Sequence, residues 1–165
     1  GSILLMYKYR SYRRPPYEGL LHGPMKLGVA RAEDVMGPYR RIECKALFRE
    51  DVVLEDPFIW KEERTYRMIA KDMYGNICGE RYGGVSAWSE NGERWNLKRG
   101  YCAYSRRILW DDGREKQMGN LDRPFILFEQ GKPRCAFFAV SDGTDGFMDA
   151  KNTWNMAVPL REELK

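Results

Sequence analysis

Two short motifs place acidic side chains one or two residues before a proline and an apolar segment, and these residue types can move protons or bind polar ligands. Glu55 and Asp56 form the first motif, and Asp122 and Arg123 form the second. Neighbouring carboxyl groups in different surroundings divide the roles of proton donor and charge holder between them. The planar guanidinium of Arg123 suits hydrogen bonds to hydroxyl or carboxylate groups. A simple turn-capping role for an Asp-Pro pair is the alternative.

Strand signals dominate the segments that must position these side chains. Charged turns at 61–64 and 129–132 predict hairpins, and an Asn-Gly pair at 91–92 predicts another tight turn. No segment has a sustained 3.6-residue period, so the sequence predicts an all-β fold. Short apolar and aromatic runs predict strands at residues 3–9, 26–32, 58–60, 66–70, 83–89, 125–128, 135–140 and 154–158.

The two acidic motifs belong to a sequence repeat, because residues 56–59 align with residues 123–126. In both copies a strand follows the proline, and a charged turn leads to a second strand. The second strand ends in a polar stretch, Lys71-Asp72 in one copy and Ser141-Asp142 in the other, and a third strand follows. The N-terminal part fits the scheme without its first strand, because residues 3–8 match 66–71 and residues 28–32 match 84–88. Four-stranded antiparallel sheets repeated without helices predict β-propeller blades. Chance alignment of short hairpins is the alternative.

The blade count sets an expectation about completeness. A closed propeller typically has about four to eight blades, and this chain holds about two and a half. We therefore expect a single partial β-propeller domain over residues 1–165, with an incomplete blade at 1–50 and further blades at 51–118 and 119–165. Either a missing N-terminal half or further copies of the chain, as a homo-oligomer, would complete the ring.

Three passages resemble five-bladed propeller glycoside hydrolases of the family 43 and family 117 type, in their C-terminal portion. Residues 28–32 with 37–40 resemble the V-A-x-S…G-P-Y/W turn of those blades, with Ala32 in place of serine. Residues 54–60 resemble the E-D-P-F-I-W innermost strand, and residues 122–127 resemble the segment with the E-G-P turn of family 43. The resemblance implies hydrolysis of glycosidic bonds in oligosaccharides or polysaccharides, with inversion.

The resemblance also implies roles for individual residues. Asp56 stands where these enzymes have the Asp that tunes the pKa of the general acid. Asp122 stands where family 43 has the acidic Glu of its E-G-P turn. Glu55 and Arg123 would then contact the substrate. Asp122 in place of Glu and Arg123 in place of Gly depart from the family pattern. The adjacent Arg123 favours the ionised form of Asp122, which is poorly suited to a general acid. The family's general base lies in a first blade, which this sequence does not contain.

Two further residues are candidate substrate contacts. Asp72 begins a polar loop that could line the rim of the central funnel around which the blades of a propeller are arranged. A solvated connection between strands is the alternative. Trp110 stands beside Asp111-Asp112-Gly113, which indicates an exposed loop, so its ring could stack on a sugar. The single acidic pair and four cysteines without a C-x-x-C pair do not predict a metal site, and we expect no metal or other cofactor.

Composition excludes several other classes of protein. The 28 basic and 24 acidic residues give a net charge of only +4, so we expect no nucleic-acid partner, although arginines and tyrosines interleave in the N-terminal third. No apolar run approaches the roughly 18 residues of a membrane-spanning helix. A non-catalytic carbohydrate-binding or interaction module is the alternative to an enzyme. Residues 1–6 lack the features of a signal peptide, and localisation is left unassigned.

Overall fold

The computed structural model describes residues 1–10, 23–42 and 46–160. Every helix or strand element in these ranges is a strand, as the sequence predicts. The described residues include no helix that is long and apolar enough to cross a membrane. In chain order the strands are β1 (Ile3–Tyr9), β2 (Lys26–Ala32), β3 (Arg40–Arg41), β4 (Leu54–Glu62), β5 (Thr65–Asp72), β6 (Gly84–Ser89), β7 (Asn96–Leu97), β8 (Arg107–Leu109), β9 (Glu115–Gln117), β10 (Asn120–Glu129), β11 (Lys132–Ser141) and β12 (Thr153–Pro159).

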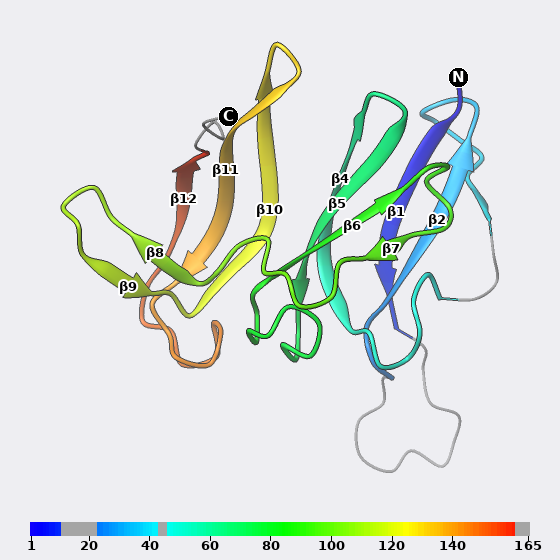
Figure 1. The fold of residues 1–165 in the computed structure, drawn as a ribbon. Coiled ribbons are helices and arrows are strands. Elements are labelled where there is room, and N and C mark those ends of the chain that lie inside the picture. Colours follow the sequence, from blue (N-terminus) through cyan, green and yellow to red (C-terminus); the bar gives the residue numbers. More distant parts are fainter. Residues whose placement is uncertain (11–22, 43–45, 161–165) are drawn as a thin grey trace, which may run out of the picture.

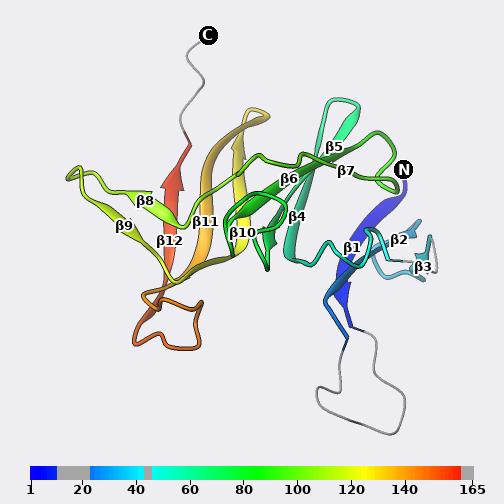
Figure 2. The ribbon, with the colours of Figure 1, turned by 60° about the horizontal axis from the view of Figure 1, so that its bottom comes forward.

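The strands form three larger antiparallel sheets and one separate hairpin. The first sheet is β1-β2-β3, the middle sheet is β4-β5-β6-β7, the third sheet is β10-β11-β12, and β8 pairs with β9. Strands that follow one another in the chain are neighbours in each sheet, and the middle sheet has four strands. Figures 1 and 2 show the middle sheet between the other two. Successive sheets of this kind have the arrangement of β-propeller blades.

The first strands of the middle and third sheets share one backbone distortion. Strand pairing slips just before Phe58 in β4 and just before Phe125 in β10. Within these slips Asp56 and Arg123 adopt positive φ values of 51° and 52°. A proline follows each of them and removes one donor from the ladder, so both sites are β-bulges. The repeat in the sequence is therefore also present in the backbone.

Hairpin turns fall where the charged residues predict them. β4 and β5 turn over residues 62–65, and β10 and β11 turn over residues 129–132. In the second turn, Gln130 and Gly131 have φ values of 51° and 77°, and positive φ at both central residues is what a type I′ turn requires. The turns close one end of each hairpin, so the two bulges lie at the opposite end.

Apolar side chains form two cores. The first joins the first and middle sheets and includes Leu27, Leu54 and Met68. The second includes Phe138 of the third sheet, against which Tyr104 packs from the segment between β7 and β8. Full burial of one large apolar side chain stabilises a fold by about 1.5–3 kcal/mol. The described strands of the first and third sheets do not contact each other, so the middle sheet connects them.

The first sheet departs by one residue from the alignment that the repeat predicts. Lys71 pairs with Gly84, so the alignment predicts that Lys8 pairs with Gly28. In the structure Gly28 pairs with Tyr7 instead. The Tyr7 ring approaches so closely that a Cβ at Gly28 would lie 2.7 Å from Tyr7 Cζ. The close cross-strand packing of this ring on a glycine accompanies the shifted register.

Candidate functional site

The two bulges bring the predicted carboxylates together. Glu55 and Asp56 lie at the start of β4, Asp122 and Arg123 lie at the start of β10, and these two strands are in contact. The backbone N–H of Arg123 donates to Asp56 Oδ2 over 3.3 Å. This hydrogen bond connects the bulge of the third sheet to the bulge of the middle sheet.

A buried lysine lies among these carboxylates. The side chain of Lys71, in β5, is only 5% exposed. Its Nζ lies 2.5 Å from Asp122 Oδ1 and 3.0 Å from Glu55 Oε2. Asp56 Oδ2 is 3.8 Å away, and the Tyr82 ring centroid is 5.9 Å away. One ammonium group therefore links carboxylates from two sheets.

Lys8 makes the same type of contact one sheet earlier. From β1, its Nζ lies 2.8 Å from Glu55 Oε1 and 2.9 Å from Asp56 Oδ1. Lys8 and Lys71 thus each reach the carboxylate at the start of the inner strand of the next sheet. We call Lys8, Glu55, Asp56, Lys71 and Asp122 the lysine–carboxylate cluster. Its three carboxylates outnumber its two ammonium groups, so the fully ionised cluster is negative.

In this cluster the combined effect of neighbouring opposite charges on the pKa values is larger than the effect of burial. Burial opposes the charge on Lys71, but the hydrogen bonds and charges of Asp122 and Glu55 raise the pKa of Lys71 above its ordinary value. The same balance, with Asp56 and Glu55 as partners, raises the pKa of Lys8. Burial also acts to raise the pKa of Glu55, yet the two lysines lower it below its ordinary value of 4.5. These three groups are therefore ionised at neutral pH.

We expect Glu55 to make the stability of the protein depend on acidity. Because the pKa of Glu55 is lowered in the folded state, its contribution to stability is complete above the unfolded-state pKa and is lost as pH falls through the folded-state pKa. Between neutral pH and about pH 3, the melting temperature of Glu55→Gln should therefore fall less than that of the unmodified chain. Glu90→Gln, at an exposed position, should behave like the unmodified chain. Equal acid sensitivity of all three proteins would contradict this role for Glu55.

Two cavities lie beside the cluster. The larger, of about 470 Å³, lies along the third sheet, and Asp122, Arg123 and Trp154 are among its lining residues. The smaller, of about 50 Å³, is lined in part by Glu55, Lys71 and Asp122. Asp122 therefore faces both the cluster and the larger cavity, and the exposed Arg123 lies at the same cavity.

The two remaining predicted contacts lie apart from these cavities. Asp72 is fully buried, and its carboxylate accepts four backbone N–H groups between Tyr74 and Cys78 over 2.8–3.2 Å. Asp72 thus organises the loop that follows β5. Trp110 lies in the turn of the β8–β9 hairpin, where its backbone N–H donates to the carbonyl of Arg114 over 2.9 Å. Neither lines the two cavities beside the cluster, and their binding roles stay predictions.

The two lysines of the cluster are functional candidates that the sequence reasoning missed. A signal for them was present, because the alignment of residues 3–8 with residues 66–71 superposes Lys8 on Lys71. Lysine side chains are mostly solvated, however, so a lysine at a strand end gives little reason to expect a buried charge. Only the packing of successive sheets brings each lysine to its carboxylates.

Comparisons with known proteins agree with this architecture. No protein-family model matches the chain, and no curated protein matches it. Among solved structures, the chain is similar to BmSUC1, a family 32 β-fructofuranosidase of Bombyx mori, with a TM-score of 0.55 and 14% sequence identity. The likeness covers 96% of this chain and 31% of that chain. It concerns the fold and does not single out family 43 or family 117. The chain therefore has the β-propeller fold of part of this structural relative and spans about a third of its length.

Proposed function

We propose that this chain forms part of the site of a glycoside hydrolase-like protein that cleaves O-glycosidic bonds in oligosaccharides or polysaccharides. The observation that carries the proposal is the convergence of Glu55, Asp56 and Asp122 at the start of two adjacent inner strands, directly beside a cavity. Carboxyl groups are the residues that most glycoside hydrolases use for this reaction. The similarity of the fold to a β-fructofuranosidase supports the same class of substrate.

The contacts of the cluster favour particular roles within this proposal. Asp56 holds negative charge in the site, and Asp122 with Arg123 faces the glycosidic oxygen. Because Lys71 donates a hydrogen bond to Asp122 over 2.5 Å, Asp122 acts as a hydrogen-bond acceptor for the substrate rather than as the proton donor. The oxygens of Glu55 and Asp122 that contact Lys71 Nζ are at most about 5.5 Å apart.

The shared lysine argues against these two carboxylates as the acid and base of an inverting mechanism. Inverting hydrolases place their acid and base roughly 6.5–9.5 Å apart, with room for a water molecule between them. Lys71 Nζ instead bridges Glu55 and Asp122, so in our proposal these two residues do not form such a pair. In our proposal the acid and base of the inverting reaction come from segments beyond this chain, in a five-bladed ring.

A hydrolysis screen on the complete protein tests the proposal. Sucrose is the first substrate, because the structural relative is a β-fructofuranosidase, and oligosaccharides from plant and algal polysaccharides follow. We expect release of a sugar from at least one of them. Proton NMR of the first product formed should show the anomer opposite to that of the substrate. A folded, complete protein that releases no sugar from any of them would contradict the hydrolase proposal.

A non-catalytic carbohydrate-binding module is the second candidate, and one observation favours it. Lys8 and Lys71 together contact all three carboxylates of the cluster. A carboxylate held by an ammonium group is well suited to accept hydrogen bonds from hydroxyl groups and poorly suited to donate a proton. A sugar that raises the melting temperature and is recovered uncleaved would support this second candidate.

A further inference from the structure

The third sheet lacks the lysine that the first two sheets carry. In the middle sheet Lys71 pairs across the strands with Glu55. In the third sheet the residue paired with Asp122 is Ala139. The sequence repeat places Ser141 in the polar stretch that corresponds to Lys71, whereas strand pairing places Ala139 at this position.

A cavity lies where this third lysine would lie. Ala139 lines the cavity of about 470 Å³, together with Asp122, its cross-strand partner. Arg123 and Asn155 also line it and supply polar groups with different hydrogen-bonding capacities. Its volume falls within the roughly 300–1,000 Å³ of typical small-molecule sites. The short side chain of Ala139 therefore leaves space beside Asp122, lined by both polar and apolar side chains.

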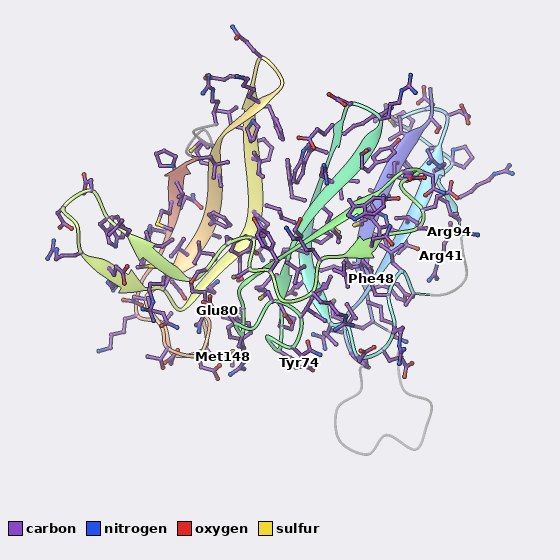
Figure 3. All side chains as sticks on the ribbon, in the orientation of Figure 1. Arg41, Phe48, Tyr74, Glu80, Arg94 and Met148 are labelled. Carbon is purple, nitrogen blue, oxygen red and sulfur yellow. The ribbon has the colours of Figure 1, made fainter. Side chains whose placement is uncertain are left out.

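An aromatic side chain stands at this cavity on a braced loop. Phe147 is 64% exposed and lines both cavities beside the cluster. Its loop, residues 142–152, is held by Asp149, which accepts the backbone N–H groups of Thr144 and Asp145 over 3.0 Å each. An ion pair of 2.8 Å between Arg81 Nη1 and Asp145 Oδ1 connects this loop to the segment between β5 and β6. In Figure 3 the adjacent Met148 lies at the same end of the sheets as Tyr74 and Glu80, the lower end in this view.

We propose that the cavity beside Ala139 is a subsite for one neutral sugar unit. Phe147 and Trp154 pack against the apolar face of the sugar ring, and Asp122, Arg123 and Asn155 form hydrogen bonds with its hydroxyl groups. Aromatic rings bury large apolar areas at little entropic cost, and the polar groups fix the orientation of the ligand. The inference rests on the proposed carbohydrate function and specifies where the sugar binds.

Ala139→Lys tests this inference. Because residue 139 pairs with Asp122 as Lys71 pairs with Glu55, the new ammonium group would reach Asp122 and fill part of the cavity. In ¹H–¹⁵N NMR titrations of the full chain with sucrose and with xylotriose, we expect the amide signals of Ala139 and Asn155 to shift in the unmodified chain. Ala139→Lys should weaken binding at least about tenfold, a difference of one decade in Kd, and should keep the melting temperature.

Three further variants separate the role of the aromatic ring from effects on the fold. Phe147→Ala should weaken binding about tenfold, whereas Phe147→Tyr should retain it. Met148→Ala is the matched control, because Met148 is 78% exposed on the same loop and does not line the larger cavity. It should bind as the unmodified chain does.

Two results would overturn the inference, and they differ in what they say of the proposed function. If a sugar binds the unmodified chain and Ala139→Lys binds it equally well, the subsite lies elsewhere and the carbohydrate function stands. If neither sugar shifts any amide signal and the complete protein cleaves nothing in the hydrolysis screen, both the subsite and the carbohydrate function are wrong.

Discussion

Replacing Asp56 by asparagine in the complete, active protein should lower turnover at least about a hundredfold, because the proposed acid–base step, typically worth about a hundredfold or more, depends on the negative charge that Asp56 holds in the site. Asp56 accepts contacts from Lys8 over 2.9 Å and from the N–H of Arg123 over 3.3 Å. Asparagine keeps one acceptor oxygen and removes the charge. It also tolerates the φ of 51° that residue 56 adopts better than most residues. The variant therefore tests the charge of Asp56 rather than the shape of the backbone.

The measurement is steady-state kinetics on whichever sugar the screen identifies. A role in the reaction predicts that kcat falls while the melting temperature changes little. Asp112→Asn is the matched control, because Asp112 is exposed and pairs with Arg114 in the β8–β9 turn. It should leave kcat unchanged. A turnover of Asp56→Asn close to that of the unmodified protein would remove Asp56 from the catalytic proposal.

Replacing Lys71 by methionine should destabilise this chain by about 3–5 kcal/mol, because it leaves buried carboxylates without their counter-charge. Lys71 is 5% exposed and contacts Asp122 and Glu55 at 2.5 and 3.0 Å. Glu55 keeps its second partner Lys8 after the substitution, so the larger loss falls on Asp122. Lys71→Arg keeps the positive charge and should cost less. Urea unfolding monitored by tryptophan fluorescence measures the free energy of unfolding of each variant.

A double-mutant cycle identifies the source of this loss. When Asp122→Asn is added to Lys71→Met, no unpaired charge is left at residue 122, so the double variant should be more stable than Lys71→Met alone. The coupling free energy between the two positions should exceed about 1 kcal/mol. Additive effects of the two substitutions, or a Lys71→Met variant as stable as the unmodified chain, would show that the cluster does not join the sheets.

Much of the fold follows from local sequence. The sequence predicts apolar strands on both sides of charged turns at 61–64 and 129–132, and the structure confirms these two hairpins. Each prediction depends only on residues within one hairpin. The repeat also aligns the acidic motifs at residues 55–56 and 122–123, and the structure brings them together with the same bulge at the start of both inner strands. These features depend on backbone geometry that a few neighbouring residues determine.

The rest of the site depends on contacts between sheets. Lys8 and Glu55 are 47 residues apart, and Lys71 and Asp122 are 51 apart, so no local pattern pairs them. The position of Ala139 depends on a second register shift in the third sheet, between Leu127 and Phe128, which changes the pairing along the strand. The sequence motifs therefore predict the carboxylates, and only the packing of the sheets shows their counter-charges.

The arrangement of the three sheets has a consequence for cooperativity. Each sheet contacts only its neighbour in the series, and the described strands of the first and third sheets do not touch. The free energy of such an array is approximately a sum of terms for each sheet and terms for each junction. Lys8 lies at one junction and Lys71 at the other. Loosening the middle sheet therefore uncouples both outer sheets at once, whereas fraying of an outer sheet leaves the opposite junction intact.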